Sequence, residues 1–200
     1  MDFASGGNQA YLTHLIDGGA EAIMVQEAKD FRLADLLPAG WKALQDTSGD
    51  AKQGSAIAVD TSALAVDRWW LVKACDAPAG GGMLPRYLCC AELAHTSGQS
   101  LTAISAHAPP PRYDHMQPGF NSKLAQVCDD YPDAVVGADA NMDIDKFAQA
   151  LGPGMRAYGK QSGICLVSAL PLSDTSQDHT GEAAGQTDHP AVWGSVGADQ

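Results

Sequence analysis

The 200-residue sequence has few basic side chains. Its 12 lysines and arginines stand against 24 aspartates and glutamates, which gives a net charge of −12. This balance argues against binding through a broad basic footprint on nucleic acid. An acidic surface often only aids solubility, but it also suits a site that recruits divalent cations. The charge alone therefore does not identify a substrate.

Long apolar runs are also missing. No stretch reaches the roughly 20 residues that a membrane-spanning helix requires, and the first seven residues lack the basic segment and the apolar core of a signal peptide. The five cysteines are odd in number and have no CxxC spacing. We therefore expect buried free thiols in a reducing compartment and a cytoplasmic location.

The composition that is present is that of an ordinary folded protein. Hydrophobic residues make up 45% of the chain and charged residues 18%, so the sequence is not disordered. A chain of 200 residues suits one domain. No internal repeat and no break in composition marks a second one, so we expect a single domain over residues 1–200.

One stretch in the last third of the chain carries the clearest chemistry. Residues 134–136 form a short apolar run that ends at Gly137, which predicts a buried strand. Asp139 and Asn141 follow it directly, where open α/β sheets place their ligands. Asp139 offers a hard oxygen ligand or a base, and Asn141 offers a neutral donor. Turn chemistry alone is the competing interpretation, because Asx residues are common in such turns.

Periodicity predicts an alternation of helices and strands. Helices are expected from Asn8 to the glycines at 18 and 19, and over 31–37, 120–131 and 143–151. Strands are expected over 22–27, 41–45, 55–59, 64–74, 86–93, 100–107, 134–136 and 163–170, and a final one over 187–193 that Asp188 and His189 open. Residues 78–82, with their three glycines, are predicted to be a hairpin loop. The polar stretch 173–186 has no periodicity, so it is predicted to be a mobile loop.

Six polar residues share one property, because each falls at the start or the end of a predicted strand. They are Glu27, His107, Asp139, Asn141, Asp188 and His189. Each taken alone has an ordinary structural explanation, such as a solvated strand end. Together they indicate one polar site at an edge of the sheets.

Four short blocks, in this order, resemble those of the endonuclease/exonuclease/phosphatase superfamily. They are Val25–Glu27, Ser105–His107, Gly137–Asn141 and Thr187–Pro190. That superfamily includes pancreatic-type deoxyribonucleases, abasic-site endonucleases, neutral sphingomyelinases and inositol polyphosphate phosphatases. The resemblance runs from about residue 8 to 196. It implies an α/β fold, a four-layer α-β-β-α sandwich of two mixed, mainly antiparallel sheets flanked by helices. It also implies that the N-terminal strand of the family, with its asparagine, is missing here.

The same resemblance implies how a metal and a phosphate would be held. Glu27 would be the metal ligand and Asp188 would assist it, with Mg²⁺ as the expected ion and Mn²⁺ as a substitute. Arg86, at the start of its strand, matches the arginine that some members aim at phosphate. These hard oxygen ligands are the kind that Mg²⁺ prefers.

The remaining four residues would handle the phosphate and the protons. By resemblance, His107 would contact the scissile phosphate, and Asp139 would orient or deprotonate the attacking water. Asn141 would hold a phosphoryl oxygen, and His189 would act as general acid or base. Histidine suits proton transfer at neutral pH because its unperturbed pKa lies close to it.

The sequence therefore predicts a Mg²⁺-dependent phosphodiesterase or nuclease, acting on a phosphate ester such as DNA or RNA. One alternative is a phosphomonoesterase acting on a small or lipid-linked phosphate. Another is a catalytically silent binding module of the same fold. A zinc hydrolase is disfavoured, because the sequence has no HxxxH pair and no HxHxDH run.

Overall fold

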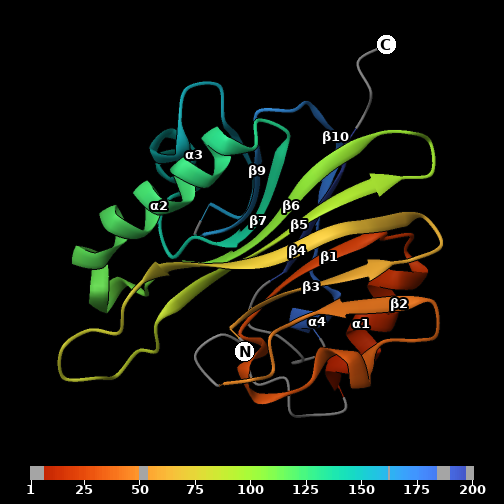
Figure 1. Ribbon diagram of the computed structural model, residues 1–200, viewed down its shortest axis with the longest axis horizontal. Coiled ribbons are helices and arrows are strands. Elements are labelled where there is room, and N and C mark those ends of the chain that lie inside the picture. Colours follow the sequence, from red (N-terminus) through yellow and green to blue (C-terminus); the bar gives the residue numbers. More distant parts are fainter. Residues whose placement is uncertain (1–6, 50–53, 162, 184–189, 197–200) are drawn as a thin grey trace.

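The computed structural model describes residues 7–49, 54–161, 163–183 and 190–196. Two β-sheets lie face to face, and helices cover their outer faces (Figure 1). This is the α-β-β-α sandwich that the sequence predicts. The residues before Gly7 lie outside the described part, so the expectation of a missing N-terminal strand is not tested.

The larger sheet has six strands in the order β4-β5-β6-β7-β9-β8. Their bounds are β4 Leu64–Cys75, β5 Arg86–His95, β6 Ser100–His107, β7 Ala134–Asp139, β8 Arg156–Gly159 and β9 Ile164–Ser168. All neighbours are antiparallel except β6 and β7, which run parallel with His107 opposite Asp139. A parallel pair needs a crossover connection, and helix α2 (Gln117–Asp130) provides it.

The smaller sheet has three antiparallel strands in the order β1-β3-β2. Their bounds are β1 Ala22–Gln26, β2 Trp41–Leu44 and β3 Ser55–Asp60. Strands β1 and β3 pack against β5, β6 and β7 of the larger sheet. Helix α1 (Gly7–Asp17) covers the outer face, where Leu12 joins Val25 and Ala56 in a buried cluster.

A two-stranded ribbon and several short helical turns complete the fold. The ribbon pairs β10 (Leu172–Asp178) with β11 (Ala191–Val196) and lies against β8 and β9. The short turns are η1 Ala28–Asp30, η2 Leu33–Leu36, η4 Pro111–Met116 and α4 Thr180–Ala183. The ribbon is tied to α1, because the Tyr11 hydroxyl donates to Asp178 O at 3.1 Å and accepts from Ala191 N at 3.0 Å.

Helix α3 (Ile144–Leu151) shows how the sequence fixes a local element. Its apolar residues at 144, 147, 148 and 151 follow the helical period, and all four are buried against the larger sheet. The carboxylate of Asp143 caps the helix by accepting from Lys146 N at 3.0 Å. The next residue after the helix, Gly152, has φ 140° and ends it. The apolar period, the cap at Asp143 and the glycine at 152 thus all indicate the same helix bounds.

Three predicted features of the sequence are wrong or incomplete. Residues 173–183 are not a mobile loop, because they form β10 and α4. β10 was hidden because it is polar and largely exposed along its length, so it has no apolar alternation. Strand β8 was not predicted, and the helix expected over 31–37 is only the short turn η2. Residues 184–186 lie outside the described part.

The five cysteines are free thiols, as predicted. Burial raises the pKa of Cys89 and Cys128 to about 12, so both stay protonated and unreactive at neutral pH. No helix in the described ranges is long and apolar enough to cross a bilayer.

The two sheets approach each other closely at Gly137, on β7. A Cβ atom at this position would lie only 2.6 Å from Cβ of Met24, on β1 of the facing sheet. Polar bonds cross the same place. Gln26 Nε2 donates to Gly137 O at 3.1 Å and to Ser105 Oγ at 3.2 Å, and Ser105 Oγ donates to Val25 O at 2.8 Å. These bonds join the ends of β1, β6 and β7.

We predict that Gly137→Ala destabilises the protein by about 1–3 kcal/mol, because the added methyl group has no room between the sheets. The matched control is Gly119→Ala, where an added Cβ on exposed α2 meets nothing within 4 Å. That change should raise stability by roughly 0.5–1 kcal/mol. Urea unfolding midpoints of both variants check this. Equal midpoints for the two would contradict the close approach.

Candidate active site

Four charged or polar side chains converge where β1, β5, β6 and β7 meet. Glu27 follows β1, Arg86 opens β5, His107 ends β6 and Asp139 ends β7. His107 Nε2 lies 3.6 Å from Asp139 Oδ2 and 3.9 Å from Glu27 Oε1. On the other side of the ring, His107 Nδ1 lies 3.4 Å from Arg86 Nη1. Glu27 and Asp139, from the second and the seventh tenth of the chain, thus meet around one imidazole.

The contact with Arg86 determines the tautomer of neutral His107. A guanidinium can only donate, so Nδ1 must accept and the proton must be on Nε2. That proton faces the carboxylates of Glu27 and Asp139. His107 is only 4% exposed. Its ring therefore holds the arginine and the two carboxylates in place, and solvent reaches little of it.

Arg86 has an unused donor inside this cluster. Its Nε atom is buried and makes no hydrogen bond within the described residues. Burial lowers the pKa of Arg86, and the nearby charges of Cys75 and Asp139 partly oppose this shift. An arginine remains a cation at neutral pH in any case. A half-buried guanidinium with a spare N–H is suited to bind an anionic oxygen.

Asp139 is oriented by the turn that follows β7. Its Oδ1 accepts from Asn141 N at 3.1 Å, and Asn141 Nδ2 donates to Ala108 O at 3.1 Å. Asn141 has φ 50°, a left-handed conformation that asparagine tolerates better than most residues. Gly163 packs against this turn so closely that a Cβ would lie 3.0 Å from Asn141 N. Asn141 therefore holds the loops after β6 and β7 together.

Backbone strain is concentrated at this site. The described residues contain three non-glycine residues with positive φ, which are Glu27 (59°), Asn141 (50°) and Asp174 (50°). Such conformations cost on the order of 1–3 kcal/mol each and cluster at functional sites. Glu27 is also the most accessible carboxylate of the cluster, with its side chain 37% exposed against 15% for Asp139.

Gln117, at the start of α2, is a supporting residue that the sequence did not reveal. Its Nε2 donates to Pro109 O at 3.0 Å and to Asn141 O at 3.2 Å, and the residue is 9% exposed. It therefore joins the segment after His107 to the turn after Asp139. It was missed because the predicted helix began at residue 120, three residues too late. Pro118, in the first turn of α2, was the available signal for the earlier helix start.

The structure therefore brings together five of the seven predicted site residues. They are Glu27, Arg86, His107, Asp139 and Asn141. Asp188 and His189 lie outside the described residues. Within the described ranges, no three histidine, cysteine or carboxylate side chains are arranged to hold a metal ion by themselves. Cys165 adds no thiolate, because burial and the nearby charge of Asp139 raise its pKa to about 12.

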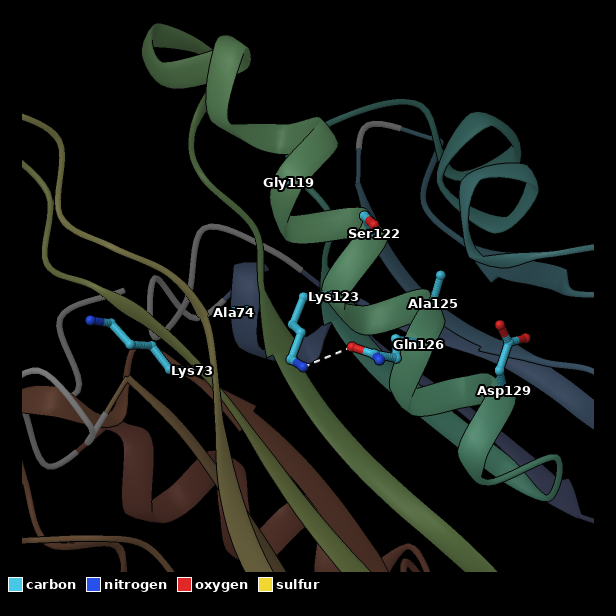
Figure 2. A pocket seen from close by; sticks show the side chains of 8 residues that line it. All are labelled: Lys73, Ala74, Gly119, Ser122, Lys123, Ala125, Gln126 and Asp129. Carbon is cyan, nitrogen blue, oxygen red and sulfur yellow. Dashed lines mark hydrogen bonds between the residues drawn. The ribbon is translucent and has the colours of Figure 1, made fainter.

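A separate groove of about 680 Å³ lies between β4 and α2. Lys73, Ser122, Lys123 and Asp129 are among its lining residues, and none of the predicted site residues is among them. Figure 2 shows Lys73 pointing away from α2 and Lys123 turned toward Gln126, to which it donates at 2.8 Å. The two lysines do not converge on a common ligand position, so the groove is not the candidate active site.

Comparison with known proteins identifies the fold and not the reaction. No protein-family model matches the sequence, and no curated protein matches it. The structure does match solved chains. Humanized D. rerio TDP2 has 14% identity and a TM-score of 0.72, covering 98% of this chain and 95% of its own. An endonuclease/exonuclease/phosphatase protein from Bacteroides vulgatus has 13% identity and a TM-score of 0.74, covering 96% and 90%.

A third match is the mannosyl-6-phosphatase Bt3783 from Bacteroides thetaiotaomicron. It has 14% identity and a TM-score of 0.71, and the match covers 95% of this chain and 90% of that one. The chain thus has the fold of the endonuclease/exonuclease/phosphatase superfamily, as the four sequence blocks indicated. At identities this low the likeness establishes the fold alone, so the chemistry has to be argued from the site.

We predict that Gln117→Ala lowers the free energy of unfolding by about 1–3 kcal/mol, because it leaves two carbonyl groups without their donor. Gln126→Ala is the control. It changes the same residue type on an exposed part of α2, and it should shift stability by less than about 0.5 kcal/mol. Amide NMR shifts should move at Ala108 and Asn141 in the first variant only. Unmoved shifts there would show that Gln117 does not join the two loops.

Proposed function

We propose that this protein is a divalent-metal-dependent hydrolase of phosphoester bonds, with Mg²⁺ as the ion and a phosphodiester as the substrate. The observation that carries the proposal is the convergence of Glu27, Asp139 and Arg86 on His107. Two carboxylates beside a half-buried guanidinium provide both halves of a phosphate site, one for a cation and one for an anion.

The donor set fits a hard cation. The carboxylates of Glu27 and Asp139 both lie within 4 Å of one ring nitrogen, at 3.9 and 3.6 Å, so their negative charges are crowded together. Glu27, the more exposed of the two, would hold the ion, and Asp188 from the C-terminal segment would assist. Bound Mg²⁺ would supply charge neutralisation at the phosphoryl oxygens, while keeping several of its waters.

The chain's own residues would divide the remaining work. Asp139, fixed by Asn141 N and by His107, would orient an attacking water and accept its proton. The free Nε–H of Arg86 would bind a phosphoryl oxygen, and Asn141 would contact another. His189 would donate a proton to the leaving oxygen. Removing one such group should cost on the order of 10²–10³ in rate.

The structural neighbours include both kinds of phosphoester chemistry. One D. rerio TDP2 structure contains a single-stranded DNA product, whereas the Bacteroides thetaiotaomicron protein is a mannosyl-6-phosphatase. A phosphomonoesterase acting on a small phosphate is therefore the second candidate for this chain. The arrangement of Glu27, Arg86 and Asp139 serves either substrate equally well.

The test is turnover of bis-p-nitrophenyl phosphate, together with nicking of plasmid DNA. We expect activity that EDTA abolishes and that Mg²⁺ or Mn²⁺ restores. Asp139→Asn and His189→Ala should each lower the rate by about 10²–10³. Asp129→Asn is the matched control, because it makes the same carboxylate-to-amide change on the exposed part of α2. Equal rates in the unchanged protein and in all three variants would contradict the proposed enzyme and favour a catalytically silent module of the same fold.

A further inference from the structure

Two loops border the candidate active site, and side-chain contacts join them to each other. The loop over residues 76–85 leads from β4 into Arg86, and the segment with η4 follows His107. Because Arg86 and His107 are in contact, both loops leave the larger sheet beside the site. Figure 1 shows the loop between β4 and β5 extending beyond the end of the sheet. Arg112 Nη2 donates to Gly82 O at 2.9 Å, and Tyr113 Oη donates to Gly81 O at 3.2 Å.

These loops present a row of cationic and aromatic groups. The guanidinium of Arg112 lies 5.1 Å from the centre of the Tyr113 ring, and the His115 ring lies edge-on to Tyr113 at 6.5 Å. Arg112 and His115 are exposed. Leu84, two residues before Arg86, is also exposed, at 42%. We call Leu84, Arg112, Tyr113 and His115 the rim.

The rim carries the positive charge of Arg112, in a protein with an excess of acidic residues. Acidic residues outnumber basic ones by 24 to 12, yet Arg112 lies close enough to Arg86 to lower its pKa, after the larger effect of burial. Arg112 uses its hydrogen bond on a backbone carbonyl and keeps its charge available. Two guanidinium groups near each other repel, and a bound anion between or beside them would relieve this.

The glycines of the loop are explained by the same arrangement. Gly80, Gly81 and Gly82 all have left-handed backbones, with φ of 95°, 79° and 87°. A Cβ at Gly82 would clash with the Tyr113 hydroxyl. The run of three glycines therefore lets the loop come close enough to hold Tyr113 and Arg112 in place. It is not a phosphate cradle at the start of a helix.

We infer that the rim binds the nucleotide next to the scissile phosphate, so that the substrate is single-stranded nucleic acid. This inference rests on the proposed function and specifies its substrate. An unstacked base has a flat π face that can stack on an arginine plane or on an aromatic ring, and its phosphate can pair with the guanidinium. A hexose phosphate has no such face. In a duplex the bases are already stacked and cannot reach the rim.

The test is the binding of a short fluorescein-labelled single-stranded oligonucleotide, followed by fluorescence anisotropy. Mg²⁺ is present, and the Asp139→Asn background suppresses turnover. Added Arg112→Ala and Tyr113→Ala should each weaken binding by about tenfold, the lower part of the range for loss of one stacking platform. Arg112→Ala should also reduce the salt dependence by about one phosphate contact, whereas Tyr113→Ala should leave it unchanged.

Arg68→Ala is the matched control. Arg68, on β4, is also an exposed arginine that lies over aromatic rings, those of Trp70 and Tyr131. It lies near the C-terminal end of α2, whereas the rim residues of η4 precede the N-terminal end of that helix. Its loss removes the same charge from the protein and should leave binding unchanged. A hexose 6-phosphate is added as competitor, and it should compete equally well with or without the Tyr113 ring, because it has no base to stack there.

The outcomes separate this inference from the proposed function, because turnover of bis-p-nitrophenyl phosphate by the unchanged protein is measured in parallel. Oligonucleotide binding that is equally weakened by Arg68→Ala, or not weakened by the rim variants, overturns the rim as a binding surface. Hydrolysis without any oligonucleotide binding overturns the inference and keeps the proposed function. Rim-dependent binding without hydrolysis keeps the rim as a binding surface for single-stranded nucleic acid, but it overturns the proposed function and with it the claim that the bound strand is a substrate.

Discussion

The parallel pairing of β6 with β7 is the constraint on which the rest of the structure depends. It places His107 directly opposite Asp139, at the end of the larger sheet. The close approach at Gly137 then brings β1 against these two strands. The hydrogen bonds of Gln26 fix the position of β1 relative to both of them. Glu27 reaches the same imidazole only because this register and this sheet spacing hold together. A slip of one residue would turn these side chains to the other face.

The site that results is electrostatically demanding. Two carboxylates face one ring nitrogen, and the half-buried guanidinium of Arg86 lies on the other side of that ring. Two carboxylates held beside the same ring nitrogen repel each other. A divalent cation would relieve that repulsion, and a phosphate would satisfy the spare donor of Arg86. Metal and substrate would thus each be bound by charged groups that the fold gathers at this edge of the sheet.

Much of this could be predicted from the sequence, because apolar periodicity and strand-end chemistry are local signals. The strand before Asp139, the strand that ends at His107 and the helix that follows Asp143 all lie where the pattern put them. What local patterns cannot carry is the contact between distant segments. Gln117 and the rim residue Arg112 act through backbone groups far along the chain, and their partners are visible only after folding. β10 was missed for another reason, since an exposed polar strand has no core face to reveal it.

The most direct measurement of the central claim is Mn²⁺ binding, followed by electron paramagnetic resonance, in the unchanged protein and in Glu27→Gln. Mn²⁺ accepts the same oxygen ligands as Mg²⁺ and is directly observable. If Glu27 holds the cation beside Asp139, the tightest Mn²⁺ site should be lost in this variant. It should be kept in Glu21→Gln, which makes the same change on an exposed residue just before β1. An identical Mn²⁺ titration for all three proteins would contradict a metal site at this cluster.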